Sequence, residues 1–270
     1  RAIWNENIPI IETGLTIGDR PVGISIVTPP ISTLINVDIR VHPKRAPSLD
    51  DLVADGWMIK ETADFLRRLA MSKHGFAIVG EIEAGKTTLL NALLPLLPNP
   101  AHTILVERSG ELRPPAEMKR LMAQWGWEDQ LPVTFGEQIG AALAAQPACL
   151  ILDEVRADEP ETIAPLLDQD NLPRQIWAVR GVPDAKRLQS AMGMLARRAA
   201  IGQGERLVHA LYDRLPFVIT VARIQERLRV FSIAEWQSRV DSDYPDYVML
   251  RRYQDGAARA TDAAPARWIE

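Results

Sequence analysis

The chain has 270 residues, of which 47% are hydrophobic and 24% charged, so it is long enough for one large globular domain or two modest ones. Its 31 basic and 35 acidic residues give a formal net charge of −4, which provides no basic field for nucleic acid, and no nucleic-acid partner is expected. No apolar run approaches the roughly 20 residues of a membrane-spanning helix, and no signal peptide is recognised after Arg1. Because an initiator methionine is missing, we expect the N-terminal domain to be truncated.

Residues 1–42 are predicted to be a partial, β-rich N-terminal domain. Three segments carry β-branched residues between turn residues, at 8–11, 23–27 and 34–41. Residues 43–72 are predicted to be a linker followed by helices. Ser48 is expected to cap a helix at 49–54, and a second helix at 61–73 has its apolar residues on one face.

The segment that follows reads G-x-x-x-x-G-K-[ST], the Walker A phosphate loop. An apolar run at 74–79 predicts a strand before it, and an apolar-rich run at 88–94 predicts a helix after it, as a phosphate loop requires. Glycines let the backbone curl its N–H groups around a phosphate, the lysine reaches the terminal phosphates, and the first threonine can ligate Mg²⁺. The predicted phosphate-binding residues are Gly80, Glu81, Ile82, Glu83, Ala84, Gly85, Lys86, Thr87 and Thr88.

Residues 73–240 then alternate between strands and helices, which is typical of a parallel sheet covered by helices. Strands are predicted at 103–106, 148–152 and 175–179, helices at 116–125, 137–145, 161–167 and 184–199, and a hairpin at 217–224 and 229–233. Residues 241–270 are predicted to be a weakly structured tail. Cys149, the only cysteine, is expected to be a buried thiol at the start of a strand.

Two predicted strands end in acids, where open α/β sheets bind their ligands. Leu150 to Glu154 is an apolar strand that ends in Asp153 and Glu154, the Walker B arrangement. Asp153 can hold Mg²⁺ through its water shell, and Glu154 can orient the attacking water. Glu107, which ends another strand, is a second candidate to position water.

In this order, the motifs resemble the secretion ATPases, the ring motors of type II and type IV secretion and of pilus assembly, and most of all their tight-adherence (Flp) pilus and type IV secretion subgroup. The resemblance covers about residues 20–235. It rests on the linker at 39–52, the Walker A segment at 80–94, the acidic box at 107–112 and the Glu-Val-Arg at 154–156. It implies an α/β fold: a RecA-like P-loop NTPase domain with a parallel sheet covered by helices, plus a small α+β N-terminal domain.

The resemblance also implies roles for residues of the site. Lys86 and Thr87 would bind the phosphates of ATP or ADP and Mg²⁺, Glu107 would polarise water, and Glu154 would be the Walker B acid. Arg40 matches an arginine that meets nucleotide phosphates near a subunit boundary; the alternative is a surface strand residue. Arg156 would bind nucleotide or pair with Glu154.

The chain departs from the family pattern at three places. Arg108 stands where the acidic box has its second acid. The family's histidine box is replaced at 175–181, where Arg180 is either a γ-phosphate sensor or an exposed turn residue. The arginine expected before Walker B is absent from 144–147. These departures concern hydrolysis rather than phosphate binding.

The preferred hypothesis is a divergent, cytoplasmic ATPase, peripheral to the inner face of the cytoplasmic membrane. It would form a homo-oligomeric ring, a hexamer, hinge at residues 43–47, and push on an inner-membrane secretion or pilus platform protein. The alternative is a nucleotide-binding assembly protein of the same fold with little or no ATP hydrolysis. A nucleic-acid translocase is disfavoured by the acidic net charge.

Overall fold

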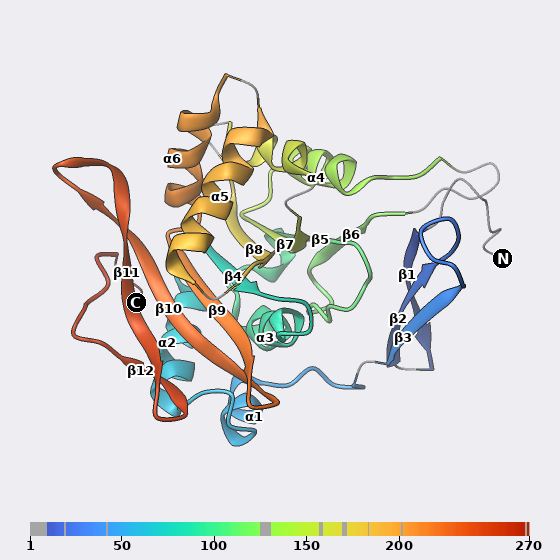
Figure 1. Ribbon diagram of the computed structural model, residues 1–270, viewed down its shortest axis with the longest axis horizontal. Coiled ribbons are helices and arrows are strands. Elements are labelled where there is room, and N and C mark those ends of the chain that lie inside the picture. Colours follow the sequence, from blue (N-terminus) through green and yellow to red (C-terminus); the bar gives the residue numbers. More distant parts are fainter. Residues whose placement is uncertain are drawn as a thin grey trace.

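The computed structural model describes residues 10–18, 20–41, 43–124, 131–156, 159–168, 172–182, 184–200, 202–267 and 269. Two sheets organise this part of the chain (Figure 1). The smaller one is antiparallel, in the order β1 (Ile10–Ile17), β2 (Arg20–Val27) and β3 (Asn36–Val41). Within the described ranges, no helix combines the length and apolar character needed to cross a bilayer.

The larger sheet has the order β12-β11-β10-β9-β4-β8-β7-β5-β6. The strands from β9 to β6 run parallel, and β10, β11 and β12 extend the sheet in antiparallel pairs. Their bounds are β4 Phe76–Gly80, β5 Thr103–Glu107, β6 Lys119–Met122, β7 Cys149–Val155, β8 Arg174–Arg180, β9 Phe217–Ile224, β10 Arg227–Arg239, β11 Ser242–Gln254 and β12 Ala257–Ala260.

Helices cover both faces of this sheet, and the alternation of side chains along each strand divides the core in two. In β4, Phe76 and Ile78 pack in one cluster, whereas Ala77 and Val79 pack in the other. The first cluster includes residues of α1 (Leu49–Ala54), α2 (Lys60–Met71) and α3 (Lys86–Leu93) and of the short turn η1 (Leu94–Leu96). The second includes residues of α4 (Phe135–Ala144), η3 (Pro160–Leu166), α5 (Ala185–Ala199) and α6 (Gly204–Arg214). The turn η2 (Pro100–His102) leads into β5.

One local and one long-range contact fix the start of α1 and the end of α2. Ser48 accepts a hydrogen bond from the Asp51 N–H and completes a capping box at the start of α1, as its sequence position predicts. Arg174 closes the end of α2, because its guanidinium donates to the carbonyls of Leu69, Ala70 and His74. This guanidinium satisfies carbonyls that a helix terminus leaves without partners.

The predicted helix at 116–125 is wrong. Residues Lys119–Met122 instead form β6, which pairs in parallel with β5, and residue 125 lies outside the described residues. The helix-favouring composition of this segment is overridden by pairing with the free edge of β5 and by the ion pair between Arg120 and the buried Glu107.

The predicted weakly structured tail is also wrong over most of its length. β11 and β12 extend the large sheet, and the segment after them is fastened to β10. The buried Glu235 carboxylate accepts hydrogen bonds from the backbone N–H groups of Ala266 and Arg267 and from the Arg267 guanidinium. A buried carboxylate needs such partners, so the C-terminal segment and β10 stabilise each other.

The remaining secondary-structure predictions are largely confirmed. The strands at 103–106, 148–152 and 175–179 correspond to β5, β7 and β8, and the long helix at 184–199 corresponds to α5. The helix expected at 161–167 is the 3-10 helix η3, and α6 was not predicted. The first predicted strand begins at Ile10, since residues 8 and 9 lie outside the described residues.

Candidate nucleotide-binding site

The Walker A segment forms a tightly curled loop between β4 and α3. Glu83 and Gly85 both adopt left-handed backbone conformations, with φ of 60° and 92°. A Cβ at Gly80 would lie 2.7 Å from the Val221 carbonyl oxygen, and one at Gly85 would meet the indole ring of Trp57. Both glycines are therefore required by close packing, and the strand–loop–helix order predicted from the sequence is confirmed.

The side chain of Lys86 reaches back to the start of the phosphate loop. The Lys86 ammonium donates to the carbonyl oxygens of Gly80, at 3.0 Å, and Glu81, at 2.8 Å. The first N–H groups of α3 have no intrahelical partner, as at any helix start, and the N-cap residue, Gly85, provides no side-chain acceptor for them. Free N–H groups and the positive end of a helix next to an ammonium form a site for an anion.

Three charged groups act on Lys86. Burial lowers the pKa of its ammonium, the Arg180 guanidinium lowers it further, and the carboxylates of Glu154 and Glu111 raise it. The strand order explains this grouping, because β8 lies between β4 and β7, so Arg180 ends a strand between the phosphate loop and the Walker B acids. Arg180 pairs in register with Gly80. The loop, the Walker B acids and Arg180 are thus brought together, as their positions at strand ends predict.

Asp153 has the properties expected of a group that receives a cation. Its Oδ2 accepts a hydrogen bond from the Arg108 N–H at 2.8 Å, whereas its buried Oδ1 has no hydrogen-bond partner among the described residues. Burial, together with the nearby Glu107 and Glu154 charges, raises the pKa of Asp153 to about 8. A cation would reverse this destabilisation of the carboxylate. The Asp153 carboxylate and the Thr87 hydroxyl, at the start of α3, therefore fit a nucleotide-bound Mg²⁺, which takes few protein ligands.

Glu107 ends β5, as predicted, but its carboxylate is held inside the protein. Its side chain is fully buried, one carboxylate oxygen accepts the Leu112 N–H at 2.8 Å, and the other pairs with Arg120. Burial raises the pKa of this carboxyl, and the charge of Arg120 opposes the shift. Glu107 therefore braces the acidic-box segment from inside, and the geometry does not support the expected contact with water. Glu111, four residues further on, is the acid of this segment that acts on Lys86.

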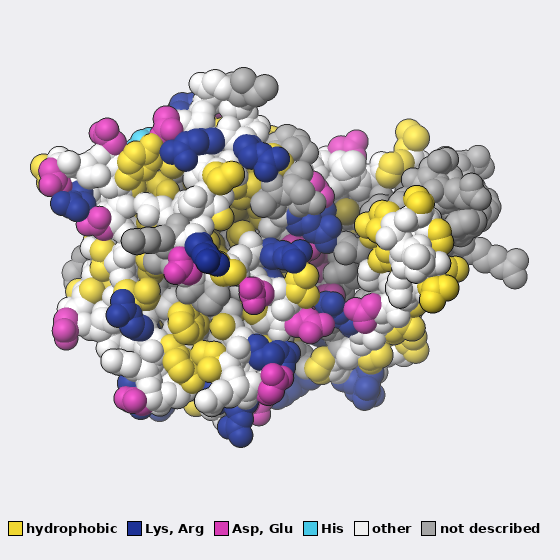
Figure 2. Space-filling model, viewed as in Figure 1, with side chains coloured by type: hydrophobic (Ala, Val, Ile, Leu, Met, Phe, Trp, Pro, Cys, Tyr) yellow, Lys and Arg dark blue, Asp and Glu magenta, His cyan; other side chains and the backbone are white. Residues whose placement is uncertain are grey.

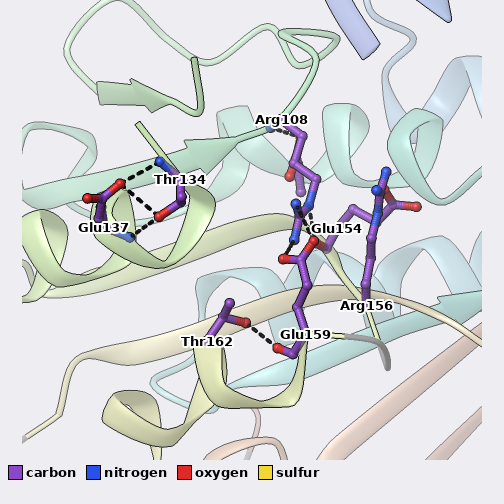
Figure 3. A network of polar contacts seen from close by, with 8 residues as sticks. Arg108, Thr134, Glu137, Glu154, Arg156, Glu159 and Thr162 are labelled. Carbon is purple, nitrogen blue, oxygen red and sulfur yellow. Dashed lines mark hydrogen bonds and ion pairs between the residues drawn. The ribbon is translucent and has the colours of Figure 1, made fainter. Parts of the chain in front are cut away.

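Arg108 connects three elements behind the Walker B acids (Figure 3). Its guanidinium forms a two-pronged contact with Glu159, at 3.2 and 2.7 Å, and its Nε donates to the Glu154 carbonyl. The guanidinium also lies 4.0 Å from the centre of the Phe135 ring. These contacts join the ends of β5 and β7 to the residue before η3, so Arg108 holds the Walker B segment in place.

Glu154 and Arg156 form an ion pair at 2.8 Å, which is the alternative raised from the sequence (Figure 3). Arg40, on β3, lies within 3.4 Å of Glu83 in the phosphate loop and 3.1 Å from Asp38. The small sheet therefore reaches the loop through Arg40. Glu81 and Glu83 are exposed, as expected for a loop whose backbone binds the anion.

A second contact joins the small sheet's linker to the acidic-box segment. The Arg113 guanidinium donates to the carbonyls of Pro43 and Lys44, and its backbone N–H donates to Asn91 on α3. Sequence reasoning missed this clasp, the Arg108 contacts and the Trp57 ring beneath Gly85. Each is a contact between residues far apart along the chain, and no local spacing indicates it.

Comparisons with known proteins agree with this architecture. A protein of Mycobacterium tuberculosis named as a conjugal transfer protein is 29% identical over 150 residues, which cover 54% of this chain and 43% of that protein. The type IV secretion system protein VirB11 of Brucella suis is 26% identical over 183 residues, which cover 57% of this chain and 50% of VirB11. The chain thus spans about half the length of the curated relatives it matches.

Solved structures show the same fold at low identity. The VirB11 ATPase of Brucella suis, in complex with sulphate, has a TM-score of 0.52 and 19% identity, with 86% of this chain and 78% of that one covered. The pilus retraction motor PilT with bound ADP has a TM-score of 0.57 and 14% identity, with 84% and 63% covered. The α/β fold with its large, mostly parallel sheet is confirmed. Residues 3–166, more than half of the sequence, match the family described as Type II/IV secretion system protein, and the chain belongs to that family.

Proposed function

We propose that this protein is an ATP-binding and ATP-hydrolysing motor of a secretion or pilus-assembly system. The observation that carries the proposal is the grouping of Lys86, Glu154 and Arg180 around one curled loop, with Asp153 beside them. Family membership and the likeness to VirB11 and PilT support it. ATP is the expected nucleotide because the sequence has no Asn-Lys-x-Asp guanine signature.

The chain's own residues divide the chemistry among them. The loop N–H groups and Lys86 bind the β- and γ-phosphates, and Thr87 and Asp153 hold Mg²⁺, which neutralises charge on the phosphates. Glu154 orients the attacking water, and its ion pair with Arg156 holds its side chain in place. Arg180 stabilises charge on the γ-phosphate from the strand end beside the loop. Of the acidic-box residues, Glu111 acts by its charge on Lys86, and Glu107 acts by its charge on Asp153.

Two polar contacts between the N-terminal part of the chain and the nucleotide domain carry the proposed movement. Arg40 touches the loop through Glu83, and Arg113 grips the linker at Pro43 and Lys44. Nucleotide in the loop changes both contacts, so the linker acts as the hinge. In a closed hexameric ring at the inner face of the cytoplasmic membrane, such hinging would push on a membrane platform protein.

ATP turnover by the purified protein tests the enzymatic part. We expect Lys86→Ala to lower turnover by about 100-fold or more, as the loss of one fixed transition-state donor does. Lys73→Ala, which removes an exposed lysine after α2, is the matched control and should leave turnover unchanged. Equal turnover in the wild type and Lys86→Ala would remove Lys86-dependent catalysis. The particle mass with and without ATP tests the ring.

A second candidate, a nucleotide-binding assembly protein that hardly hydrolyses ATP, is favoured by one observation. Arg108 replaces the second acid of the acidic box, and its guanidinium is fully engaged by Glu159 and the Glu154 carbonyl. This candidate predicts ATP binding that Lys86→Ala abolishes, together with turnover at background in the assembled particle. Robust steady-state hydrolysis would exclude it.

A further inference from the structure

A cavity of about 420 Å³ lies between α2 and the C-terminal edge of the large sheet. Its volume is within the range of ligand pockets, roughly 300–1,000 Å³. Phe65 of α2, Leu250 of β11 and Ile269 contribute apolar walls. The strand at this edge of the sheet is β12. Three strands, β9, β10 and β11, lie between it and β4, which leads into the phosphate loop, so the cavity is separate from the nucleotide site.

Three arginines line this cavity, and only one of them has carboxylate partners among the described residues. Arg267 pairs with the buried Glu235 at 3.1 Å and donates to the Trp236 carbonyl. Its other charge partner is Asp213, at 3.9 Å. Arg267 is therefore a structural residue that fastens the C-terminal segment, and its charge is already balanced.

Arg251 is in the opposite situation. Among the described residues, no ion pair links it to a carboxylate, and its guanidinium makes one long hydrogen bond, of 3.4 Å, to the Thr62 hydroxyl, which itself donates to the Ala258 carbonyl. Its Nε is buried and has no acceptor in the same part of the chain. The guanidinium lies 5.2 Å from the centre of the Phe65 ring, which fixes its plane against the apolar wall.

Arg68 adds a second uncompensated charge on the same cavity. It is exposed on α2, and the described part of the chain provides it with no ion pair. Burial, together with the like charge of Arg68, lowers the pKa of Arg251, and Glu61 is the one acid that opposes this shift. Two neighbouring guanidinium groups with unfilled donors and an apolar wall are complementary to an anion carried on an apolar body.

We propose that this cavity binds the C-terminal carboxylate of a partner polypeptide whose last side chain is apolar. The guanidinium fork of Arg251, assisted by Arg68, takes the carboxylate, and the wall of Phe65, Leu250 and Ile269 takes the side chain. A membrane surface fits less well, because Arg251 is recessed and half-buried and the net charge of the protein is −4. A narrow extended chain can reach Arg251.

Calorimetric titration of the whole chain tests this with N-acetylated tetrapeptides that end in leucine, valine or phenylalanine. Each is used with a free C-terminal carboxylate and as the C-terminal amide. We expect at least one acid to bind ten-fold or more tightly than its amide, and Arg251→Met to reduce that ratio to about one. Arg68→Met, at an exposed position that does not affect folding, should weaken acid binding by about three-fold or more. Arg252→Met, at the next and exposed residue of β11, should change nothing.

ATP binding by each variant serves as the folding control, because the cavity and the phosphate loop are separate. Equal affinity for acid and amide, no binding of any acid at millimolar concentration, or a ratio unaffected by both Arg251→Met and Arg68→Met would overturn the proposal. Inorganic phosphate and vesicles of phosphatidylserine in phosphatidylcholine are titrated in parallel. Arg251-dependent binding of either one that equals the acid peptides would overturn the polypeptide assignment.

Discussion

The two sheets of this protein differ in how their apolar residues are covered. In β7 of the large sheet, Ile151 and its neighbours are fully buried between helices on both faces. In β3 of the small sheet every residue is exposed, and Val37, Ile39 and Val41 are 54%, 59% and 57% exposed. Figure 2 shows hydrophobic side chains gathered over the small sheet.

This difference means that the small sheet contributes a residue to the candidate site but little to the stability of the protein. The large sheet holds both clusters of the core, whereas the small sheet contributes Arg40 to the phosphate loop and buries few of its described side chains. Regions with few buried contacts open at lower free energy than the core. We therefore expect the small sheet to open without unfolding the large one.

The largest expected effect comes from the same substitution placed in each sheet. Ile151→Ala in β7 removes a fully buried side chain and should lower the free energy of unfolding by about 2–5 kcal/mol. Ile39→Ala in β3 should change it by about 0.5 kcal/mol or less, because the side chain is mostly in water. Urea denaturation followed by circular dichroism measures both. A similar loss of unfolding free energy in the two variants would contradict the difference in burial between the two sheets.

A smaller effect is expected from pH, through the one thiol of the large sheet. Burial raises the pKa of Cys149 from 9.0 to about 11, so the folded state keeps the proton after the unfolded chain has lost it. Stability should therefore fall as pH rises from about 9 to 11, and the loss at pH 10 should be about 1.4 kcal/mol. The difference between the wild type and Cys149→Ala in urea denaturation at each pH isolates this contribution.

Labelling of the Cys149 thiol also tests whether the two sheets open independently. At pH 8, iodoacetamide should label Cys149 no faster than the large sheet opens, while amides of β3 exchange hydrogen quickly. Labelling of Cys149 that keeps pace with β3 exchange would mean that the two sheets open together.

The smallest effect is expected at the ion pair that joins the sheets. Arg40 and Glu83 are both roughly half exposed, so a double-mutant cycle of Arg40→Ala and Glu83→Ala should give a coupling of about 1 kcal/mol or less. It should appear in the hydrogen exchange of β3 amides and fade at about 1 M salt, where the screening length is about 3 Å. Asp38→Ala, which removes the partner of Arg40 on its own strand, is the control. A coupling energy that persists at high salt would contradict the exposed position of this ion pair in the structure.

Much of the site could be predicted because its residues lie in short, ordered motifs. The curl of the phosphate loop is encoded by Gly80 and Gly85, and the strand order places Arg180 and Asp153 beside it. Glu107 ends β5 as predicted, but a strand end specifies a position at the sheet edge and not the direction in which the side chain points. The Arg120 that fixes this direction lies on a strand the sequence did not reveal.

The errors in the predicted secondary structure have the same origin. The edge strand β6 and the strands β11 and β12 are formed by pairing with distant strands, and their own composition favours helix or an unstructured tail. Buried strands such as β7 were predicted well, because an unbroken apolar run carries its own signal. The helix α6 follows α5 closely, and its apolar residues, Leu207, Val208, Leu211 and Tyr212, were overlooked.

The two carbonyl groups that Lys86 contacts bear on the proposed nucleotide site. The ammonium donates to the carbonyls of Gly80 and Glu81, and these contacts brace the curled loop from within. If the loop binds a nucleotide as we propose, we expect phosphate binding to be a ligand exchange at one nitrogen atom rather than a disorder-to-order transition of the backbone. Release of the product would then restore the same two contacts without refolding of the loop.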